Sequence, residues 1–382
     1  MVNTERIIRE FTALASIDSP SFQEGAIAHY LQQRFEALGA QVVFDDAGAA
    51  VGSQSGNLIA RLPARGKSGE ALLLSAHMDT VQPGEGVQPV LTDGVFRSAG
   101  DTILGADDKA GLTEILEALA VVQEENIPHG PIEIVVTICE EQGLMGAKAL
   151  DLSQLSATRG LALDTCGVDC VTNRAPGANR LRIDIEGVES HAGIAPEKGI
   201  SAIEVAARAI ARMPLGRIDA ETTANIGRIE GGVADNIVAK EVKIHAEARS
   251  HDAEKLARQT QAMVDAFEQA AEALARTIDG QRRRAQVRAS VRPDYPIMAV
   301  AQDHPVMLLL QSAAADLGRP CQVMTGGGGS DANIFTGGGL PTVILGSGMA
   351  QVHSVHEQVT VADMVRVSEL LVAILRRAWD VA

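Results

Sequence analysis

Four short apolar segments in this chain each run directly into residues that can bind a metal ion. The segments are ALLLSAH (71–77), PIEIVVTI (131–138), GLAL (160–163) and LPTVIL (340–345). The residues that end or follow them are His77, Asp79, Glu140, Glu141, Asp164 and His353. Apolar runs of this length between turn residues are typical of buried strands. Because ligands bind beyond the carboxyl ends of the strands in an open α/β sheet, the pattern predicts one site at that edge.

Amphipathic helical patterns alternate with these strands and indicate an α/β domain with a mixed sheet. The expected helices cover residues 4–17, 27–38, 305–317 and 361–379, and a further helix begins near Asp107. Short strands are expected at 42–44 and 57–62, and a polar loop at 82–101. At the start of its helix, Asp107 could simply cap free N–H groups, so its role depends on its neighbours.

The pattern changes between about residues 179 and 291. Apolar and charged residues alternate at 181–185 and 242–248, which is typical of strands with one exposed face, and helical stretches cover 200–213 and 252–275. These features predict a smaller two-layer α+β domain at 178–291. Since the fourth ligand strand follows this insertion, the larger domain must be discontinuous and comprise residues 1–177 and 292–382.

The charge balance limits the partners of this chain. Its 33 Lys and Arg residues against 49 Asp and Glu residues give a net charge of −16, which argues against nucleic acid and suits cations. We see no signal-peptide pattern, no apolar run long enough to span a membrane, and no paired spacing among the four cysteines. The expectation is a cytoplasmic protein without membrane or nucleic-acid partners.

The candidate ligands combine imidazole with carboxylate groups. Such a mixed set suits zinc, with cobalt or manganese as alternatives, whereas oxygen ligands alone would indicate calcium or magnesium. Five direct ligands exceed the needs of one zinc ion, so two ions sharing a bridging carboxylate are expected. The neighbours Glu140 and Glu141 point to opposite sides in extended backbone, which lets one bind metal and the other act as a general base. Asp79 can orient an imidazole without touching metal.

Five motifs carry a family resemblance: AHMDT, GADDKAG, CEEQGLMGA, ALDTCG and VHSVHE. In order and approximate spacing they resemble the co-catalytic dinuclear zinc peptidases, a family that includes peptidase T, glutamate carboxypeptidase, acetylornithine deacetylase and succinyl-diaminopimelate desuccinylase. The DDKAG form is most similar to the peptidase T-like branch. The resemblance implies that Asp107 bridges two metals, that His77 and Asp164 complete one site and Glu141 and His353 the other, that Asp79 orients His77, and that Glu140 is the base.

Two neighbouring residues compete with the assigned ligands. The family pattern places the ligand four residues before a glutamate, which selects His353 over His356 because Glu357 follows at that distance. Asp108 lies beside Asp107, and the family pattern D-x-K leaves it as a solvated charge in the first helical turn.

The resemblance also covers the insertion, because family members carry an inserted lid and dimerisation domain. It implies a homodimer through this domain. His191 in GVESHAG resembles the lid histidine that donates a hydrogen bond to the oxyanion, often from the partner subunit. Asn236 and Arg249 resemble substrate-binding positions, although a surface ion pair remains the alternative for Arg249.

A glycine-rich run, TGGGGSDAN at 325–333, could bind a phosphate or a substrate backbone. No G-K-[ST] follows the glycines, so a nucleotide loop is disfavoured. We expect instead that Gly328, Ser330 and Asn333 contact a peptide substrate.

The sequence therefore predicts a zinc-dependent metallopeptidase that cleaves small peptides, similar to peptidase T in acting as an aminopeptidase. Water activated by the two ions would lose its proton to Glu140 and attack the scissile carbonyl. An N-acyl amino acid deacylase or a carboxypeptidase is the alternative within the family, since the link from Asp79 to Asp107 is shorter than expected for peptidase T. A catalytically inactive peptide-binding protein and a nucleotide-binding protein are the alternatives from other classes.

Overall fold

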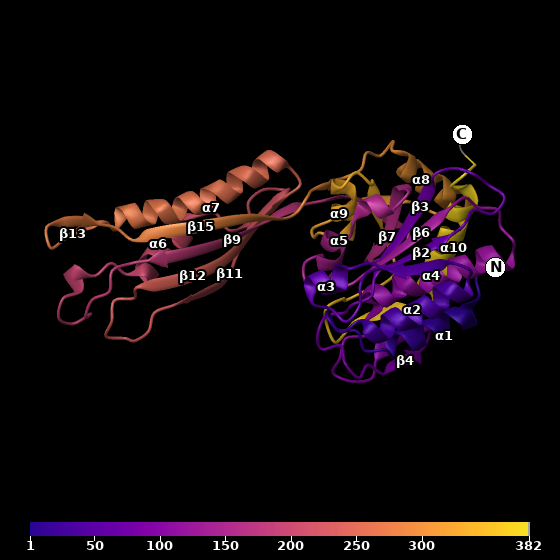
Figure 1. Cartoon of the computed structure of the whole chain (residues 1–382), viewed down its shortest axis with the longest axis horizontal. Helices are drawn as coiled ribbons and strands as arrows, with labels where there is room; N and C mark the ends of the chain where they lie inside the picture. The colour runs from indigo at the N-terminus through magenta and orange to yellow at the C-terminus, as the bar shows by residue number, and fades with distance from the viewer. Residues whose placement is uncertain (381–382) are drawn as a thin grey trace. The chain divides into compact units, whose positions relative to one another are not determined.

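The computed structural model describes residues 1–380, which divide into two compact units (Figure 1). The large unit contains residues 1–175 and the chain from 298 onwards, and the small unit contains residues 176–297. The sequence predicts the smaller domain at 178–291, with its first boundary two residues later and its second six residues earlier than those of the small unit. No helix within residues 1–380 is both long and apolar enough to cross a membrane.

The large unit is built on a nine-stranded mixed sheet with the order β1-β2-β6-β3-β7-β18-β8-β16, and β17 pairs with β8. The strands are β1 (Gln41–Phe44), β2 (Leu58–Leu62), β3 (Ala71–His77), β6 (Ile132–Thr137), β7 (Ala157–Thr165), β8 (Cys170–Ala175), β16 (Met298–Ala299), β17 (Gln322–Thr325) and β18 (Thr342–Gly346). The pairs β6–β3, β3–β7 and β7–β18 are all parallel. The four segments that the sequence singles out are therefore four adjacent parallel strands, and their carboxyl ends share one edge.

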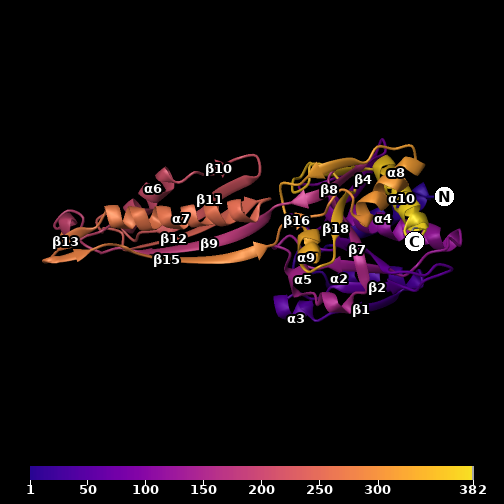
Figure 2. The ribbon, with the colours of Figure 1, turned by 90° about the horizontal axis from the view of Figure 1, so that it is seen from above.

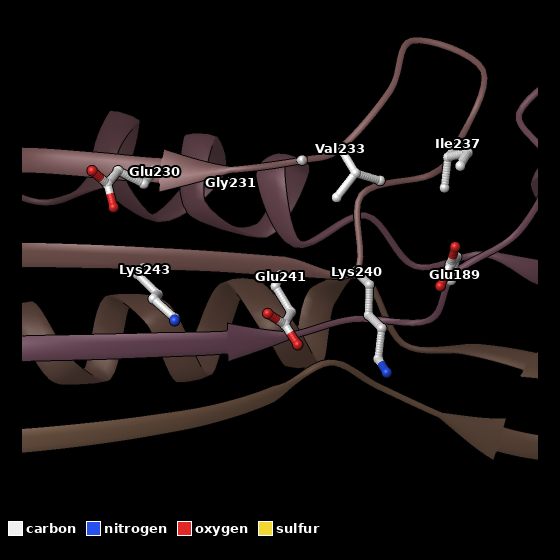
Figure 3. Close-up of a pocket in the computed structure, with 9 residues that line it drawn as sticks. Glu189, Glu230, Gly231, Val233, Ile237, Lys240, Glu241 and Lys243 are labelled. Carbon is white, nitrogen blue, oxygen red and sulfur yellow. The ribbon is translucent and has the colours of Figure 1, made fainter.

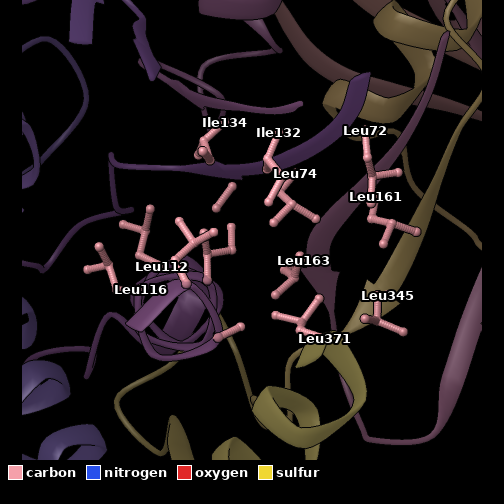
Figure 4. Close-up of a cluster of buried hydrophobic side chains, with 14 of the residues drawn as sticks. Leu72, Leu74, Leu112, Leu116, Ile132, Ile134, Leu161, Leu163, Leu345 and Leu371 are labelled. Carbon is pink, nitrogen blue, oxygen red and sulfur yellow. The ribbon is translucent and has the colours of Figure 1, made fainter. Parts of the chain in front are cut away.

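Helices cover both faces of this sheet. They are α1 (Thr4–Ala15), α2 (Gly25–Ala37), α3 (Ala47–Val51), α4 (Ala106–Glu124), α5 (Met145–Ala149), α8 (Pro305–Asp316), α9 (Asp331–Gly337) and α10 (Val361–Arg377), with a 3-10 turn at Leu152–Gln154. On one face, Leu72 and Leu161 of the strands pack in the same buried cluster as Leu112 of α4 and Leu371 of α10 (Figure 4). On the other face, Leu73 shares a cluster with Phe335 of α9. Parallel strands buried on both faces read as continuous apolar runs, which is why the sequence revealed them.

The expected polar loop at 82–101 is wrong. It contains a hairpin of β4 (Pro89–Thr92) and β5 (Val95–Ser98), which β19 (Gln358–Thr360) extends to three strands. Asp93 and Gly94 form the turn with positive φ angles of 51° and 76°. An Asp-Gly pair is a strong hairpin signal, so the sequence did contain the necessary information. The flanking strands hid it because Phe96 is their only buried side chain.

The small unit has an antiparallel sheet with the order β10-β11-β12-β9-β15. Its strands are β9 (Gly177–Glu186), β10 (Gly216–Arg217), β11 (Thr222–Gly231), β12 (Glu241–Ser250) and β15 (Gln286–Tyr295). The helices α6 (Ala202–Arg212) and α7 (Ala253–Ala273) lie over one face (Figure 2). A 3-10 turn at Pro196–Lys198 and the hairpin of β13 (Arg276–Ile278) and β14 (Gln281–Arg283) complete the unit. Strands β11 and β15 escape prediction, because few of their side chains are buried and they lack clear alternation.

Candidate dinuclear metal site

The carboxylate of Asp107 lies between two imidazole rings. Its Oδ1 is 3.0 Å from His77 Nε2, and its Oδ2 is 3.2 Å from His353 Nε2. His77 Nε2 is also 3.8 Å from Asp164 Oδ1, and His353 Nε2 is 2.9 Å from Glu141 Oε1. Two adjoining sets of nitrogen and oxygen donors thus share Asp107, and in each set the ligand atoms lie within 4.8 Å of one another.

The parallel strands bring these residues together. His77 is the last residue of β3, Asp164 lies near the end of β7, and Glu141 follows β6. Asp107 lies in the first turn of α4, and His353 lies in the segment between β18 and β19 with a positive φ of 59°. A left-handed backbone at a residue other than glycine costs free energy and clusters at functional sites.

His77 is held in one orientation by Asp79. The Nδ1 atom of His77 lies 2.9 Å from the backbone carbonyl of Asp79, which can only accept, so Nδ1 carries the proton and Nε2 faces Asp107. The carboxylate of Asp79 accepts hydrogen bonds from the backbone N–H groups of Glu140 (2.8 Å) and Glu141 (3.3 Å) and from Ser21 Oγ (2.7 Å). Asp79 therefore contacts the imidazole through its carbonyl, with its carboxylate 3.6 Å from Nδ1, and holds the backbone of both glutamates through its side chain.

A pocket of about 270 Å³ opens beside these groups. It is lined by Asp107, Glu140, Glu141, Asp164, Thr165, Cys166, Thr172, Gly326, Gly327, Gly328, Gly329, Ser330, Ile344, Met349, Val352 and His353. Four of these residues are carboxylates, and none is a lysine or arginine. The pocket thus has the mixed His and carboxylate donors that suit zinc, and an excess of negative charge that divalent cations would neutralise.

The crowding of buried carboxylates in this pocket shifts their pKa values. Burial raises the pKa of Glu140 and of Asp164 well above the usual range, and the negative charges of neighbouring carboxylates add to the shift. Burial would also raise the pKa of Asp107, but hydrogen bonds with His353 and His77 lower it below its ordinary value. The shared carboxylate is therefore the one most strongly held in its charged form.

Asp108 is not the solvated charge that the sequence predicts. It is fully buried, and its Oδ2 accepts a hydrogen bond from the backbone N–H of His77 at 3.3 Å. The backbone of Asp107 and Asp108 is not helical (ψ of 100° and 34°), so the usual first-turn geometry does not apply. Burial raises the pKa of Asp108 well above its ordinary value.

The glycine-rich run lines the pocket with Gly326 to Gly329 and Ser330, while the last residues of the run are tied up in capping the helix that follows. Ser330 caps α9 by accepting from the Ala332 N–H, and Asn333 Oδ1 accepts from the Ser330 N–H at 3.0 Å. Asn333 is fully buried and does not line the pocket, so the substrate contact expected for it is not supported. A Cβ at Gly328 would meet no atom within 4 Å, which leaves this wall of the pocket open.

Sequence reasoning misses several polar residues behind the site. They are the partly buried Ser21 and the buried Glu24, Asp331 and Glu357. Glu24 Oε1 accepts from the Cys139 N–H at 3.0 Å, directly before Glu140. Asp331 accepts from the Thr137 hydroxyl, and burial raises its pKa to about 6. These residues lie outside any periodic pattern, and only the position of Glu357 after His353 offered a signal.

The predicted oxyanion donor and the predicted substrate-binding residues of the insertion lie in the small unit. His191 is exposed, its Nδ1 accepts from the N–H groups of Gly193 and Ile194, and the next residue, Ala192, donates its N–H to the Asn236 carbonyl. Arg249 forms two hydrogen bonds with Glu247, at 3.0 and 3.1 Å. That contact corresponds to the ion-pair alternative for Arg249.

A second pocket, of about 420 Å³, belongs to the small unit alone. It is lined by Glu189, Glu230, Gly231, Gly232, Val233, Ile237, Lys240, Glu241 and Lys243 (Figure 3). Carboxylates and amines alternate around it, so its charges are close to balanced. It holds no histidine or cysteine, unlike the pocket of the large unit.

Fold and site together define a metal-dependent peptidase. The model of Peptidase family M20/M25/M40 matches residues 73–377, and the chain belongs to this family. It is 46% identical to the uncharacterized protein YqjE of Bacillus subtilis strain 168 over 99% of this chain and 100% of that protein. It is 30% identical to Peptidase T of Escherichia fergusonii over 72% of this chain and 66% of that protein.

Solved structures agree with this assignment. Aminopeptidase PepT from Bacillus cereus ATCC 10987 superposes with a TM-score of 0.89 at 44% identity, covering 98% of both chains. A tripeptidase from Staphylococcus aureus subsp. aureus Mu50 gives a TM-score of 0.93 at 38% identity over 100% of both chains. The YXEP protein of Bacillus subtilis, a dinuclear metal-binding peptidase, shares the fold at 16% identity, with a TM-score of 0.74 over 99% of both chains.

Proposed function

We propose that this protein is a dinuclear zinc aminopeptidase that hydrolyses small peptides, in the manner of peptidase T. One observation carries the proposal: each oxygen of the Asp107 carboxylate faces a different histidine, so one residue joins two donor sets. The similar solved structures are an aminopeptidase and a tripeptidase, which supports small peptides as substrates. Four free cysteines are consistent with the cytoplasmic location that we also propose.

In this proposal the donor sets hold one zinc ion each. His77, Asp107 and Asp164 would bind the first ion, and Asp107, Glu141 and His353 the second. Cobalt or manganese could occupy the same donors. When bound, such ions polarise a carbonyl and lower the pKa of water.

Glu140 is the proposed general base. It is 9% exposed and lines the pocket, where its carboxylate can accept a proton from the attacking water and deliver it to the leaving nitrogen. Asp79 fixes the backbone of Glu140, which keeps the base beside the donor sets. Gly328 and Ser330, which also line the pocket, would flank the substrate.

We assign three supporting roles to the small unit by family resemblance. His191 would donate a hydrogen bond to the oxyanion, Asn236 and Arg249 would bind substrate, and the unit would act as lid and dimerisation domain. One exposed edge of its sheet is an argument for the dimer. On its outer side β11 pairs with β10 only at Thr223 and Ala224, so the outer side from Asn225 to Gly231 has no strand partner among the described residues. A monomer with full activity in sedimentation would rule out action of His191 across subunits.

The first experiment replaces the base. Glu140→Gln keeps the size of the side chain but cannot accept the proton, so we expect kcat to fall by about 10²–10⁴-fold with two zinc ions still bound. Metal content and peptide hydrolysis are measured on the same sample, with Glu141→Gln as the variant that should lose metal. Substantial remaining hydrolysis by Glu140→Gln would show that Glu140 is not the general base.

A substrate panel separates the family alternatives. Four carboxylates line the pocket of the large unit, which favours a free N-terminal ammonium there, whereas a substrate carboxylate would pair with Arg249, the substrate-binding residue assigned to the small unit. Tripeptides should therefore be cleaved faster than N-blocked tripeptides and N-acyl amino acids. The reverse order would identify a deacylase or carboxypeptidase, and binding without hydrolysis or metal would identify a peptide-binding protein.

A further inference from the structure

The carboxylate of Glu357 accepts three backbone N–H groups from the segment that leads into Asp107. Its Oε2 accepts from Leu104 at 2.8 Å and from Gly105 at 2.7 Å, and its Oε1 accepts from Asp107 itself at 2.9 Å. Glu357 is only 2% exposed. The first N–H groups of a helix have no partner within it, and α4 lacks a side-chain cap at Gly105. A carboxylate from 250 residues downstream supplies the missing acceptor.

We propose that Glu357 is a positioning residue that fixes the Asp107 carboxylate between the two metal positions before any ion binds. This inference rests on the proposed function, because it takes Asp107 as the ligand shared by two ions. Three N–H groups on one anionic carboxylate form strong, directional bonds. They fix the backbone of Asp107 itself, so the side chain starts from one defined place.

The sequence position of Glu357 links both halves of the site. It lies four residues after His353, so one short segment carries a ligand and also holds the backbone of the shared ligand. The buried ammonium of Lys109 interacts electrostatically with Glu357 and donates to the Ile17 carbonyl at 2.7 Å. Burial raises the pKa of Glu357, and a nearby counter-charge reduces the cost of burying this residue in its charged form.

A purely structural cap would have the same hydrogen bonds, so the test needs a matched control. Glu133 in β6 is another buried carboxylate, 3% exposed, and its Oε2 accepts from the N–H groups of Ser156 and Ala157, both at 2.8 Å. It lies near the start of β6, whereas the candidate ligands follow the end of that strand. Glu133 thus shares the chemistry of Glu357 but holds no candidate ligand.

The experiment compares Glu357→Gln with Glu133→Gln. Zinc dissociation constants come from competition with a chromophoric chelator, and thermal unfolding is recorded for the metal-free proteins. We expect Glu357→Gln to weaken binding of both ions by about 10–100-fold, and excess zinc to restore kcat with KM unchanged. We expect Glu133→Gln to bind zinc like the wild type, whatever its stability. Equal zinc affinities in all three proteins, or equal losses in both variants, would overturn the inference.

The unaltered protein provides a second test that does not depend on folding of a variant. In the metal-free wild type, amide hydrogen exchange at Leu104, Gly105 and Asp107 should be slow, because their acceptor is already in place. Fast exchange that slows only when zinc is added would refute pre-positioning. Failure of the wild type to bind two zinc ions would refute the proposed function itself, whereas two bound ions with an unaffected Glu357→Gln refute only this inference.

Discussion

The two units treat charge in opposite ways. On the sheet of the small unit, Arg288 pairs with Glu186 at 2.7 Å and Arg249 pairs with Glu247 at 3.0 Å. In the pocket of the large unit, Asp107, Glu140 and Asp164 are largely or wholly withdrawn from water and no lysine or arginine faces them. The small unit balances these charges with arginine side chains, while the pocket of the large unit gathers more carboxylates than its one lining histidine, His353, can balance, an excess that bound cations would neutralise.

The exposed ion pairs of the small unit and the buried carboxylates of the large unit differ in how much they contribute to the free energy of folding. Partly exposed ion pairs contribute on the order of 0–1 kcal/mol, because water and salt screen them. Buried carboxylates without partners cost several kcal/mol each, so ions that neutralise them stabilise the folded state strongly. The comparison predicts that metal matters greatly to the large unit and that single ion pairs matter little to the small one.

The largest effect should come from the shared ligand. Asp107→Asn removes the negative charge that faces both histidines, so both metal positions should be lost together. Peptide hydrolysis should then fall on the order of 10³-fold or more, since metal chemistry supplies several kcal/mol of the barrier. Metal content by atomic emission and kcat/KM with a tripeptide are the measurements. Retention of one full equivalent of zinc would show that Asp107 is not shared.

An intermediate effect should follow removal of metal. If the free zinc concentration is about 100 times the Kd of each site, chelation should lower the free energy of unfolding by about 3 kcal/mol for each ion removed. Calorimetry with and without chelator measures the shift in melting temperature. Asp107→Asn is the control, because its melting temperature should no longer change when the chelator is added. If the melting temperature of the wild type does not change either, the contrast between the two units is wrong.

The smallest effect should come from an ion pair of the small unit. Arg288→Ala removes the contact with Glu186, whose side chain is 37% exposed, so the free energy of unfolding should change by less than about 1 kcal/mol. Urea unfolding of Arg288→Ala, Glu186→Gln and the double variant gives the coupling between them. A coupling above 2 kcal/mol would mean that the small unit depends on its charges as strongly as the large one.

The metal site was more predictable than its surroundings because its ligands follow the most regular part of the sequence. Strands β3, β6 and β18 and the middle of β7 are buried on both faces and therefore largely apolar, and three candidate ligands lie at or just past the carboxyl ends of β3, β6 and β7. Strand β11 could not be identified in this way, because five of its last six residues are exposed and carry no alternating pattern.

The predictions for individual side chains differ from the structure for local reasons. The prediction for Asp108 assumed a regular first helical turn, and the irregular backbone there buries it instead. The prediction for Asn333 assumed an open loop, whereas Asn333 completes a capping box with Ser330. The three hydrogen bonds of Glu357 join segments about 250 residues apart, and no local pattern reveals such a contact.

The order of the strands along the chain also governs when the site can be completed during synthesis. A nascent chain that has just passed β7 already contains His77, Asp107, Glu141 and Asp164, but His353 and Glu357 come only after the whole small unit. At roughly 5–20 residues per second, the ribosome needs roughly 10–40 s to cover the about 190 residues from Asp164 to His353. The last member of the second donor set, His353, and the residue that we propose positions Asp107 therefore arrive together and late. Peptide hydrolysis would begin only when the chain is nearly finished, which keeps truncated products inert.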